Sequence, residues 1–312
     1  MKFMVGLQTA NNAFLDHIIK RKEHIYEVYF SWGDFANGRN SQIENSAFLP
    51  WDLQQKQIEA LRRLSQNNIA LNLLFNANCY GRDSLSRSFF QKIGDTVDYI
   101  VTRFGLQSVT TTSPLIAKFI KQNFSDIEVR ASVNMRIGTT QGMDYVSNLF
   151  DSFYLQRELN RNFDKIAAVK KWCDTRGKRL YLLANSGCLN HCSAHTFHDN
   201  LVSHESELAK MDNAYAFHGI CREYLKNPAH LDTLITDTSF IRPEDTDLYA
   251  PFVPAVKLAT RIHKNPCLVL ESYIRRKYSG DILALLEPAH SIYPYVLENG
   301  NPLKLVKLNE EF

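Results

Sequence analysis

Short runs of apolar, β-forming residues alternate with segments of helical periodicity along nearly the whole chain. This alternation predicts parallel strands joined by crossover helices. Eight runs have the length of a strand, and eight strands close a parallel barrel. The predicted strands cover residues 3–8, 27–31, 70–76, 108–112, 128–134, 152–156, 180–184 and 255–260. The pattern therefore predicts an α/β protein with a TIM-like (β/α)8 barrel.

The segments between these strands predict helices and one unusually long connection. Apolar residues recur at helical spacing within residues 52–67, and Pro114 is typical of a helix start. The stretch 187–249, between the seventh and eighth strands, far exceeds an ordinary connection, and such insertions are usually functional. We find no internal repeat, low-complexity segment or Gly/Ser linker, so we expect a single domain over residues 1–312 that contains this insertion.

Composition and charge narrow the class of protein without naming a partner. The chain has 312 residues, of which 45% are hydrophobic and 22% charged, as in soluble globular proteins. Its 36 basic and 33 acidic residues give a net charge of +3, so an RNA substrate is left open but has no support from charge. The apolar start is too short for a secretory signal, and no stretch is long enough to span a bilayer. We therefore expect a cytoplasmic protein that does not act in a membrane.

Six cysteines in a cytoplasmic chain of this size indicate metal binding or catalysis, because the reducing pool keeps thiols free. In a parallel barrel the active site gathers where strands end, so each cysteine can be sorted by its position after a strand. Cys188 follows the seventh predicted strand and Cys79 the third, which places both on the catalytic face. Cys173 instead ends a predicted helix before the seventh strand, and we exclude it from the site.

Three of these cysteines predict a metal site. Cys188 and Cys192 are four residues apart, the spacing that brings side chains to one side of a helical turn. Cys221 lies in the same insertion and can fold back on the pair. An iron–sulfur cluster is the interpretation that we favour. The simplest alternative is a set of ordinary buried cysteines.

The fourth ligand and the metal are left open by the spacing alone. Cys79 is the preferred fourth ligand because it shares the strand-end face, and Cys267, after the eighth strand, is the alternative. A zinc site that uses His195 beside the cysteines would satisfy the same spacing. Each histidine of this segment, taken alone, is more typical of a residue that only binds backbone or solvent.

Polar residues follow several predicted strands and should gather at one barrel mouth. Arg157 and Glu158 follow the sixth strand, Asn134 the fifth and Asn76 the third. Arg157 could hold a substrate carboxylate through two hydrogen bonds, and Glu158 could act as acid or base; the alternative is a structural ion pair. No G-x-S-x-G, H-E-x-x-H, G-x-G-x-x-G or Walker motif occurs, which removes the usual support for serine hydrolases, zincins, Rossmann dehydrogenases and P-loop enzymes.

The order of several motifs resembles that of the collagenase-like peptidase family. This family includes the oxygen-independent ubiquinone hydroxylation proteins and the tRNA and ribosomal RNA hydroxylation factors. The matching segments are Arg157-Glu158-Leu159, Cys221-Arg222 with Tyr224, Phe240-Ile241-Arg242-Pro243-Glu244-Asp245 and Lys257-Leu258-Ala259-Thr260-Arg261. The chain departs from the family at Ala259-Thr260, where the family has Glu-Gly, and around Cys188, where it has Ser-Gly-x-Cys. We therefore expect a distant branch.

The resemblance implies a barrel with a four-cysteine 4Fe-4S cluster and hydroxylation without molecular oxygen, with prephenate as the oxygen donor. On this interpretation the cysteines bind the cluster, and a small carboxylated substrate or donor binds at the mouth. We expect catalytic roles for Arg157, Glu158 and His195, and substrate-binding roles for Asn76, Asn134, Arg242 and Arg261. The alternatives are a zinc-dependent hydrolase or peptidase, in which Glu158 assists an activated water, and a non-catalytic partner of another protein in a larger complex.

Overall fold

Eight parallel strands close into a barrel in the computed structural model, which describes residues 1–38, 51–208, 210–212, 215, 217, 219–231, 234–289, 296–298 and 301–302. The strands follow one another around the barrel in chain order, and β8 pairs with β1 to close it. They are β1 (Lys2–Gly6), β2 (Ile25–Phe30), β3 (Leu71–Phe75), β4 (Ser108–Thr111), β5 (Glu128–Ala131), β6 (Ser152–Tyr154), β7 (Arg179–Leu183) and β8 (Ala255–Leu258). Each overlaps one predicted strand, so the TIM-like fold is confirmed.

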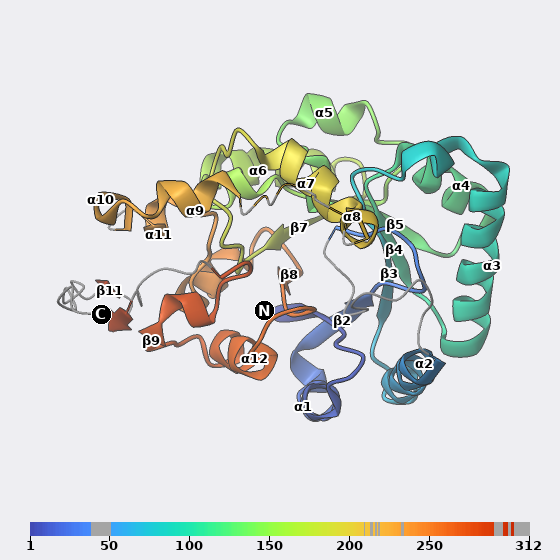
Figure 1. Cartoon of the computed structure of the whole chain (residues 1–312), viewed down its shortest axis with the longest axis horizontal. Helices are drawn as coiled ribbons and strands as arrows, with labels where there is room; N and C mark the ends of the chain where they lie inside the picture. The colour runs from blue at the N-terminus through green and yellow to red at the C-terminus, as the bar shows by residue number, and fades with distance from the viewer. Residues whose placement is uncertain are drawn as a thin grey trace.

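Helices connect the first seven strands and surround the barrel, with α1, α2 and α12 on one side of it and α5, α6 and α7 on the other (Figure 1). The α-helices are α1 (Asn12–Lys20), α2 (Trp51–Gln66), α3 (Arg87–Phe104), α4 (Pro114–Asn123), α5 (Thr140–Asp144) and α6 (Phe163–Asp174). Short 3-10 helices are η1 (Lys22–His24), η2 (Gly81–Leu85), η3 (Val133–Met135) and η4 (Arg157–Leu159). The predicted helix over residues 52–67 is α2, and Pro114 opens α4 as expected.

The long connection between β7 and β8 is built from short helices. They are α7 (His195–Ser203), α8 (Glu205–Leu208), α9 (Ile220–Tyr224), α10 (Pro228–Leu231), α11 (Leu234–Asp237) and η5 (Pro243–Tyr249). After β8 come α12 (Pro266–Arg275), β9 (Gly280–Asp281), η6 (Ile282–Ala284), β10 (Val296–Glu298) and β11 (Asn301–Pro302). Within the described part of the chain, every helix is too short or too polar to span a bilayer.

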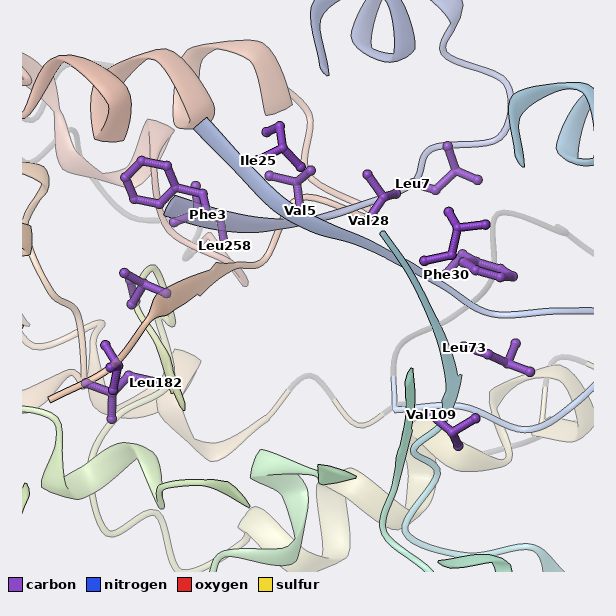
Figure 2. Packing of buried hydrophobic residues seen from close by; sticks show 14 of the residues in the cluster. Phe3, Val5, Leu7, Ile25, Val28, Phe30, Leu73, Val109, Leu182 and Leu258 are labelled. Atoms are coloured by element: carbon purple, nitrogen blue, oxygen red, sulfur yellow. The ribbon is translucent and has the colours of Figure 1, made fainter. Parts of the chain in front are cut away.

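Alternate residues of the strands form what we call the outer shell, an apolar layer between the barrel and its helices (Figure 2). Side chains of a strand point to opposite faces in turn, so a strand can be apolar toward the helices and different toward the barrel axis. The shell is continuous with buried residues of the helices, such as Phe14 of α1 and Leu61 of α2. Its strand residues include Phe3, Val5, Val28, Phe30, Leu73, Val109, Leu182 and Leu258.

The other face of the strands lines the barrel interior, which holds ionisable groups as well as apolar ones. Its apolar and aromatic members are Met4, Tyr29, Leu74, Val133, Tyr154, Tyr181, Leu183 and Ala255. Among them Arg130 is fully buried, forms an ion pair with Glu27 and lies over the Tyr181 ring at 4.2 Å. Lys257 lies over the Tyr29 ring at 4.0 Å. Ionic and aromatic contacts therefore fill the centre of the barrel.

Candidate active site at the barrel mouth

Cys188 and Cys192 lie in an irregular loop of residues 184–194, which we call the cysteine loop, between β7 and α7. Leu189 pairs with Thr238 in an antiparallel bridge, and the Asn190 N–H donates to the Asp237 carbonyl at 2.6 Å. The prediction of a helical turn through the two cysteines is therefore wrong. Pairing with residues almost fifty positions later holds the segment as a loop, and the helix begins only at His195.

Cys221 lies in α9 and joins the other two thiols. Gly219, which precedes α9, has a φ of +84°, and a Cβ at this position would lie 3.3 Å from Cys221 Sγ, so the close approach depends on a glycine here. Burial raises the pKa of the Cys221 thiol, and the charges of Cys188 and Cys192 raise it further. The three thiols are therefore close enough to interact electrostatically. A pocket of about 630 Å³ is lined by Cys192 and Cys221 together with His191, Tyr224 and Asp237.

Cys79, the preferred fourth ligand, lies at the other end of α7 from these thiols. The N–H of Asn78 donates to Ser203 Oγ at 3.0 Å, at the last residue of α7, whereas Cys192 comes just before the first. A helix of nine residues is about 13 Å long. The strand-end argument placed Cys79 on the correct face of the barrel, but α7 separates it from the three thiols.

Cys267 and Cys173 both lie on helices outside the barrel. Cys267 is in α12, where burial and the charge of Glu271 raise its pKa, and Glu271 pairs with Arg21 beside α1. Cys173 is fully buried near the end of α6, and burial, with Asp174 beside it, raises its pKa to about 11. Neither residue is at the mouth, because each belongs to a helix that packs against the outer shell.

Arg157 connects the cysteine loop with the barrel mouth. It opens η4 shortly after the end of β6 and is only 5% exposed. One guanidinium nitrogen donates to Cys188 Sγ at 3.5 Å, and another hydrogen-bonds to His195 Nε2. A guanidinium can only donate, so His195 accepts at Nε2 and carries its proton on Nδ1.

Glu158 and His195 lie beside Arg157, and burial and the neighbouring charges set their charge states. Burial raises the pKa of Glu158, yet a backbone hydrogen bond and the charges of Arg136 and Arg157 outweigh it and hold that pKa below its ordinary value. Its salt bridge is with Arg136, at 2.7 Å, so Glu158 is ionised, which is the form of a general base and not of a general acid. Burial and the Arg157 charge lower the pKa of His195 to about 4, so its imidazole is neutral at pH 7.

Three of the four expected substrate-binding residues line one cavity at the carboxyl ends of the strands. Asn76 and Asn134 contact each other, with the Asn134 side-chain N–H donating to the Asn76 carbonyl at 3.4 Å. Arg261 donates to Asn37 Oδ1 at 2.8 Å. The free volume is about 60 Å³, which suits a small ligand. The charged residues of its wall are Arg157, Asp199, Lys257, Arg261 and Glu287.

Arg242, the fourth expected substrate-binding residue, lies outside this cavity. It precedes η5 and forms two hydrogen bonds with Asp245, at 2.6 and 2.8 Å. It lines a separate pocket with Arg161 and Tyr249. The expectation of a common mouth does not hold for Arg242, because η5 belongs to the insertion and a local carboxylate already binds its fork.

Lys257 lines the mouth, although the sequence analysis assigned it no role. It lies on β8, is 8% exposed and contacts the rings of Tyr29 and Tyr154 at 4.0 and 5.1 Å. Burial lowers its pKa to about 7, with the Arg261 charge as the next cause. One signal was available, since a lysine within the apolar run of a predicted strand must face either solvent or a polar barrel interior.

The three thiols, with Arg157 beside Cys188, are a donor set of the kind that binds an iron–sulfur cluster. Over the described residues, no three His, Cys, Asp or Glu side chains are placed to hold one ion. Zinc requires every ligand atom within about 2.0–2.3 Å, so the thiolates around it nearly touch. A four-iron cluster is wider, and its cysteines surround it at larger separations. Thiols that interact electrostatically next to the cationic Arg157 are compatible with that larger anionic group.

Comparisons with known proteins agree with the family resemblance. An uncharacterized protease of Methanocaldococcus jannaschii is 24% identical over 285 residues, covering 90% of this chain and 81% of that protein. A solved structure described as a U32 peptidase has a TM-score of 0.58 at 14% identity, covering 83% of this chain and 92% of the other. No family model matches the chain. Together these likenesses support a distant branch of the collagenase-like (U32) peptidases.

Proposed function

We propose that the chain is an iron–sulfur-dependent enzyme, as its resemblance to the collagenase-like peptidase family implies. Its reaction is oxygen-independent hydroxylation, or related redox chemistry, on a small molecule or an RNA base at the barrel mouth. The observation that supports this most is the position of Arg157, which contacts Cys188 Sγ at 3.5 Å and also lines the mouth cavity. One side chain therefore joins the thiols to the place where a substrate binds.

Cys188, Cys192 and Cys221 would hold the cluster, which supplies one-electron redox chemistry when bound. The family resemblance implies four cysteine ligands of the cluster. Among the described residues only three are brought together here, so one ligand position remains for a group other than Cys79 or Cys267. Cys221 has a raised pKa, so binding the cluster must release its proton. Binding of the cluster should therefore weaken as the pH falls.

Arg157 and His195 would orient an anionic group at the mouth. Neutral His195 accepts a hydrogen bond from the guanidinium and so fixes its direction, while ionised Glu158 holds Arg136 nearby. The remaining guanidinium N–H groups suit a carboxylate, which a guanidinium binds through two parallel hydrogen bonds. A small carboxylated molecule, such as the prephenate that the resemblance implies as donor, carries that group.

Anaerobic purification followed by visible spectroscopy and by iron, sulfide and zinc analysis tests this proposal. The native protein should be brown and contain iron and sulfide. Cys188→Ala, Cys192→Ala and Cys221→Ala should each lose the iron, whereas the matched controls Cys173→Ala and Cys267→Ala should keep it. Equal iron in all five variants, or a colourless protein without iron, would refute the cluster.

A zinc-dependent peptidase is the second candidate, and one observation favours it: the relatives just described are called a protease and a peptidase. In that case zinc would activate a water, with Glu158 assisting. The same metal analysis separates the candidates, because a colourless protein with one equivalent of zinc and hydrolysis of a peptide that stops with a chelator supports the peptidase.

A further inference from the structure

The mouth cavity contains an amine in an environment that suits covalent chemistry. Lys257 Nζ lies over the Tyr29 ring, and among the described residues it has no hydrogen bond or ion pair. Burial and the Arg261 charge outweigh the attraction of the Glu27 carboxylate, and so they shift the Lys257 ammonium toward its neutral form. Since the cavity reaches Lys257, a ligand there meets a nucleophile rather than a charge.

We propose that Lys257 is a catalytic residue that forms a reversible imine with the carbonyl group of a small 2-oxo carboxylic acid bound at the mouth. This rests on the mouth being the ligand site named above, but it does not depend on the cluster. We expect a carboxylic acid because the cationic side chains of Arg157 and Arg261 line the same cavity as the Lys257 amine. A carboxylate binds to a guanidinium fork, and the adjacent carbonyl carbon then faces the amine.

The step is a condensation without oxidation or reduction. The Nζ lone pair forms a bond to the carbonyl carbon, and the carbonyl π electrons move to its oxygen, which takes up a proton. The resulting carbinolamine loses that oxygen as water while the nitrogen loses its proton, so amine plus carbonyl gives imine plus water. The carboxylates of Asp199 and Glu287 line the same cavity and can carry the protons.

The electrostatic environment of Lys257 is the one that activates lysine nucleophiles elsewhere: burial together with a neighbouring cation. With its pKa lowered to about 7, the amine is about 90% neutral at pH 8. An exposed lysine with a pKa of about 10.4 is only about 0.4% neutral at that pH. A less basic amine attacks a carbonyl more slowly, which offsets part of the advantage of Lys257 in neutral fraction. We therefore expect Lys257 to react about tenfold faster than an exposed lysine.

Reductive trapping tests the proposal. The anaerobically purified protein is incubated with pyruvate or glyoxylate and sodium cyanoborohydride at pH 8, and adducts are located by peptide mass mapping. The adduct should form on Lys257 at about tenfold higher yield than on Lys170, a partly exposed lysine of α6 that pairs with Asp174. Lactate, which lacks the carbonyl, should give none. Lys257→Met should abolish the adduct while Lys170→Met leaves it, and Arg261→Gln should raise the acid concentration required about tenfold.

Adducts spread evenly over the lysines, or none on Lys257 with either acid, would overturn the imine. Mapping the native protein decides this even if Lys257→Met fails to fold. The outcome is distinct from that of the cluster test, because trapping on Lys257 in a protein without iron refutes the cluster and keeps the imine. An iron-loaded protein without the adduct refutes the imine and keeps the cluster.

Discussion

The outer shell and the barrel interior are built by the same eight strands, yet they differ in chemistry. In the shell, Val28 and Leu182 meet apolar helix faces, so each contact is replaceable by another of similar volume. In the interior, Glu27 and Arg130 are buried ions that depend on each other. The shell therefore supplies general stability, whereas the interior fixes particular groups below the mouth. Substitutions on the two faces of a strand should accordingly have different consequences.

The largest effect should come from breaking the ion pair inside the barrel. Arg130→Met leaves Glu27 buried without its partner, which typically costs about 3–5 kcal/mol of unfolding free energy. Urea unfolding measures this. The double variant Glu27→Gln with Arg130→Met removes both charges and should recover most of the loss. A single variant that costs less than about 1 kcal/mol would mean that solvent reaches the pair.

A cavity in the outer shell should have the next largest effect. Leu182 is fully buried on β7, and Leu182→Ala should cost about 3 kcal/mol through lost burial and the cavity left behind. The same measurement on Leu85→Ala is the control, because Leu85 is 77% exposed. Iron content and trapping at Lys257 should not change in Leu182→Ala, since the residue faces the helices. A change in either would show that the two faces of the strands are coupled.

The shell was the part of the fold that the sequence could predict. Its strands read as apolar runs, and apolar periodicity depends only on residues a few positions apart. The interior was missed because its partners are far apart along the chain: Arg130 contacts Glu27 and Tyr181, which belong to other strands. A charged residue within an apolar run has no local sign that says which face it takes.

The candidate site divides in the same way. Strand ends correctly located Arg157, Asn76 and Asn134, because the carboxyl ends of parallel strands meet on one face of the barrel. The cysteine loop was predicted from local spacing alone, and the bridge between Leu189 and Thr238 overrides that spacing. The sequence was enough to assign residues of the insertion to the site, but it was not enough to predict their backbone conformation.

A smaller effect of opposite sign is expected for Lys257→Met. Folding lowers the Lys257 pKa to about 7 through burial and then the Arg261 charge, whereas the unfolded chain keeps a value of about 10.4. Between these values the unfolded state binds a proton that the folded state does not, so the stability of the native protein rises with pH over this window. The Lys257→Met variant has no lysine at this position, so this cause of rising stability with pH is absent from it.

Lys257→Met should therefore be more stable than the native protein at pH 7, by about 2 kcal/mol, and this advantage should shrink by pH 10. Urea unfolding at both pH values measures it, with Lys170→Met as a control that shows no such convergence. A variant that is less stable at both pH values would show that the ammonium is stabilised in the barrel, and that the interior tolerates this charge as it tolerates the paired Arg130.

The smallest effect on stability, with the most specific effect on binding, is expected for Arg157→Lys. The substitution keeps a positive charge where the interior meets the cysteine loop, but an ammonium cannot reproduce the fork that reaches both Cys188 and His195. We expect a loss of about 1 kcal/mol in unfolding free energy and unchanged iron content. Half-maximal trapping of pyruvate at Lys257 should require about tenfold more acid, which corresponds to about 1.4 kcal/mol of binding.

Arg136→Lys is the matched control, because Arg136 pairs with Glu158 and is absent from the cavity wall. If Arg157→Lys loses its iron or melts far below the native protein while pyruvate trapping is unaffected, Arg157 is a support of the cysteine loop and not a ligand-binding residue of the mouth.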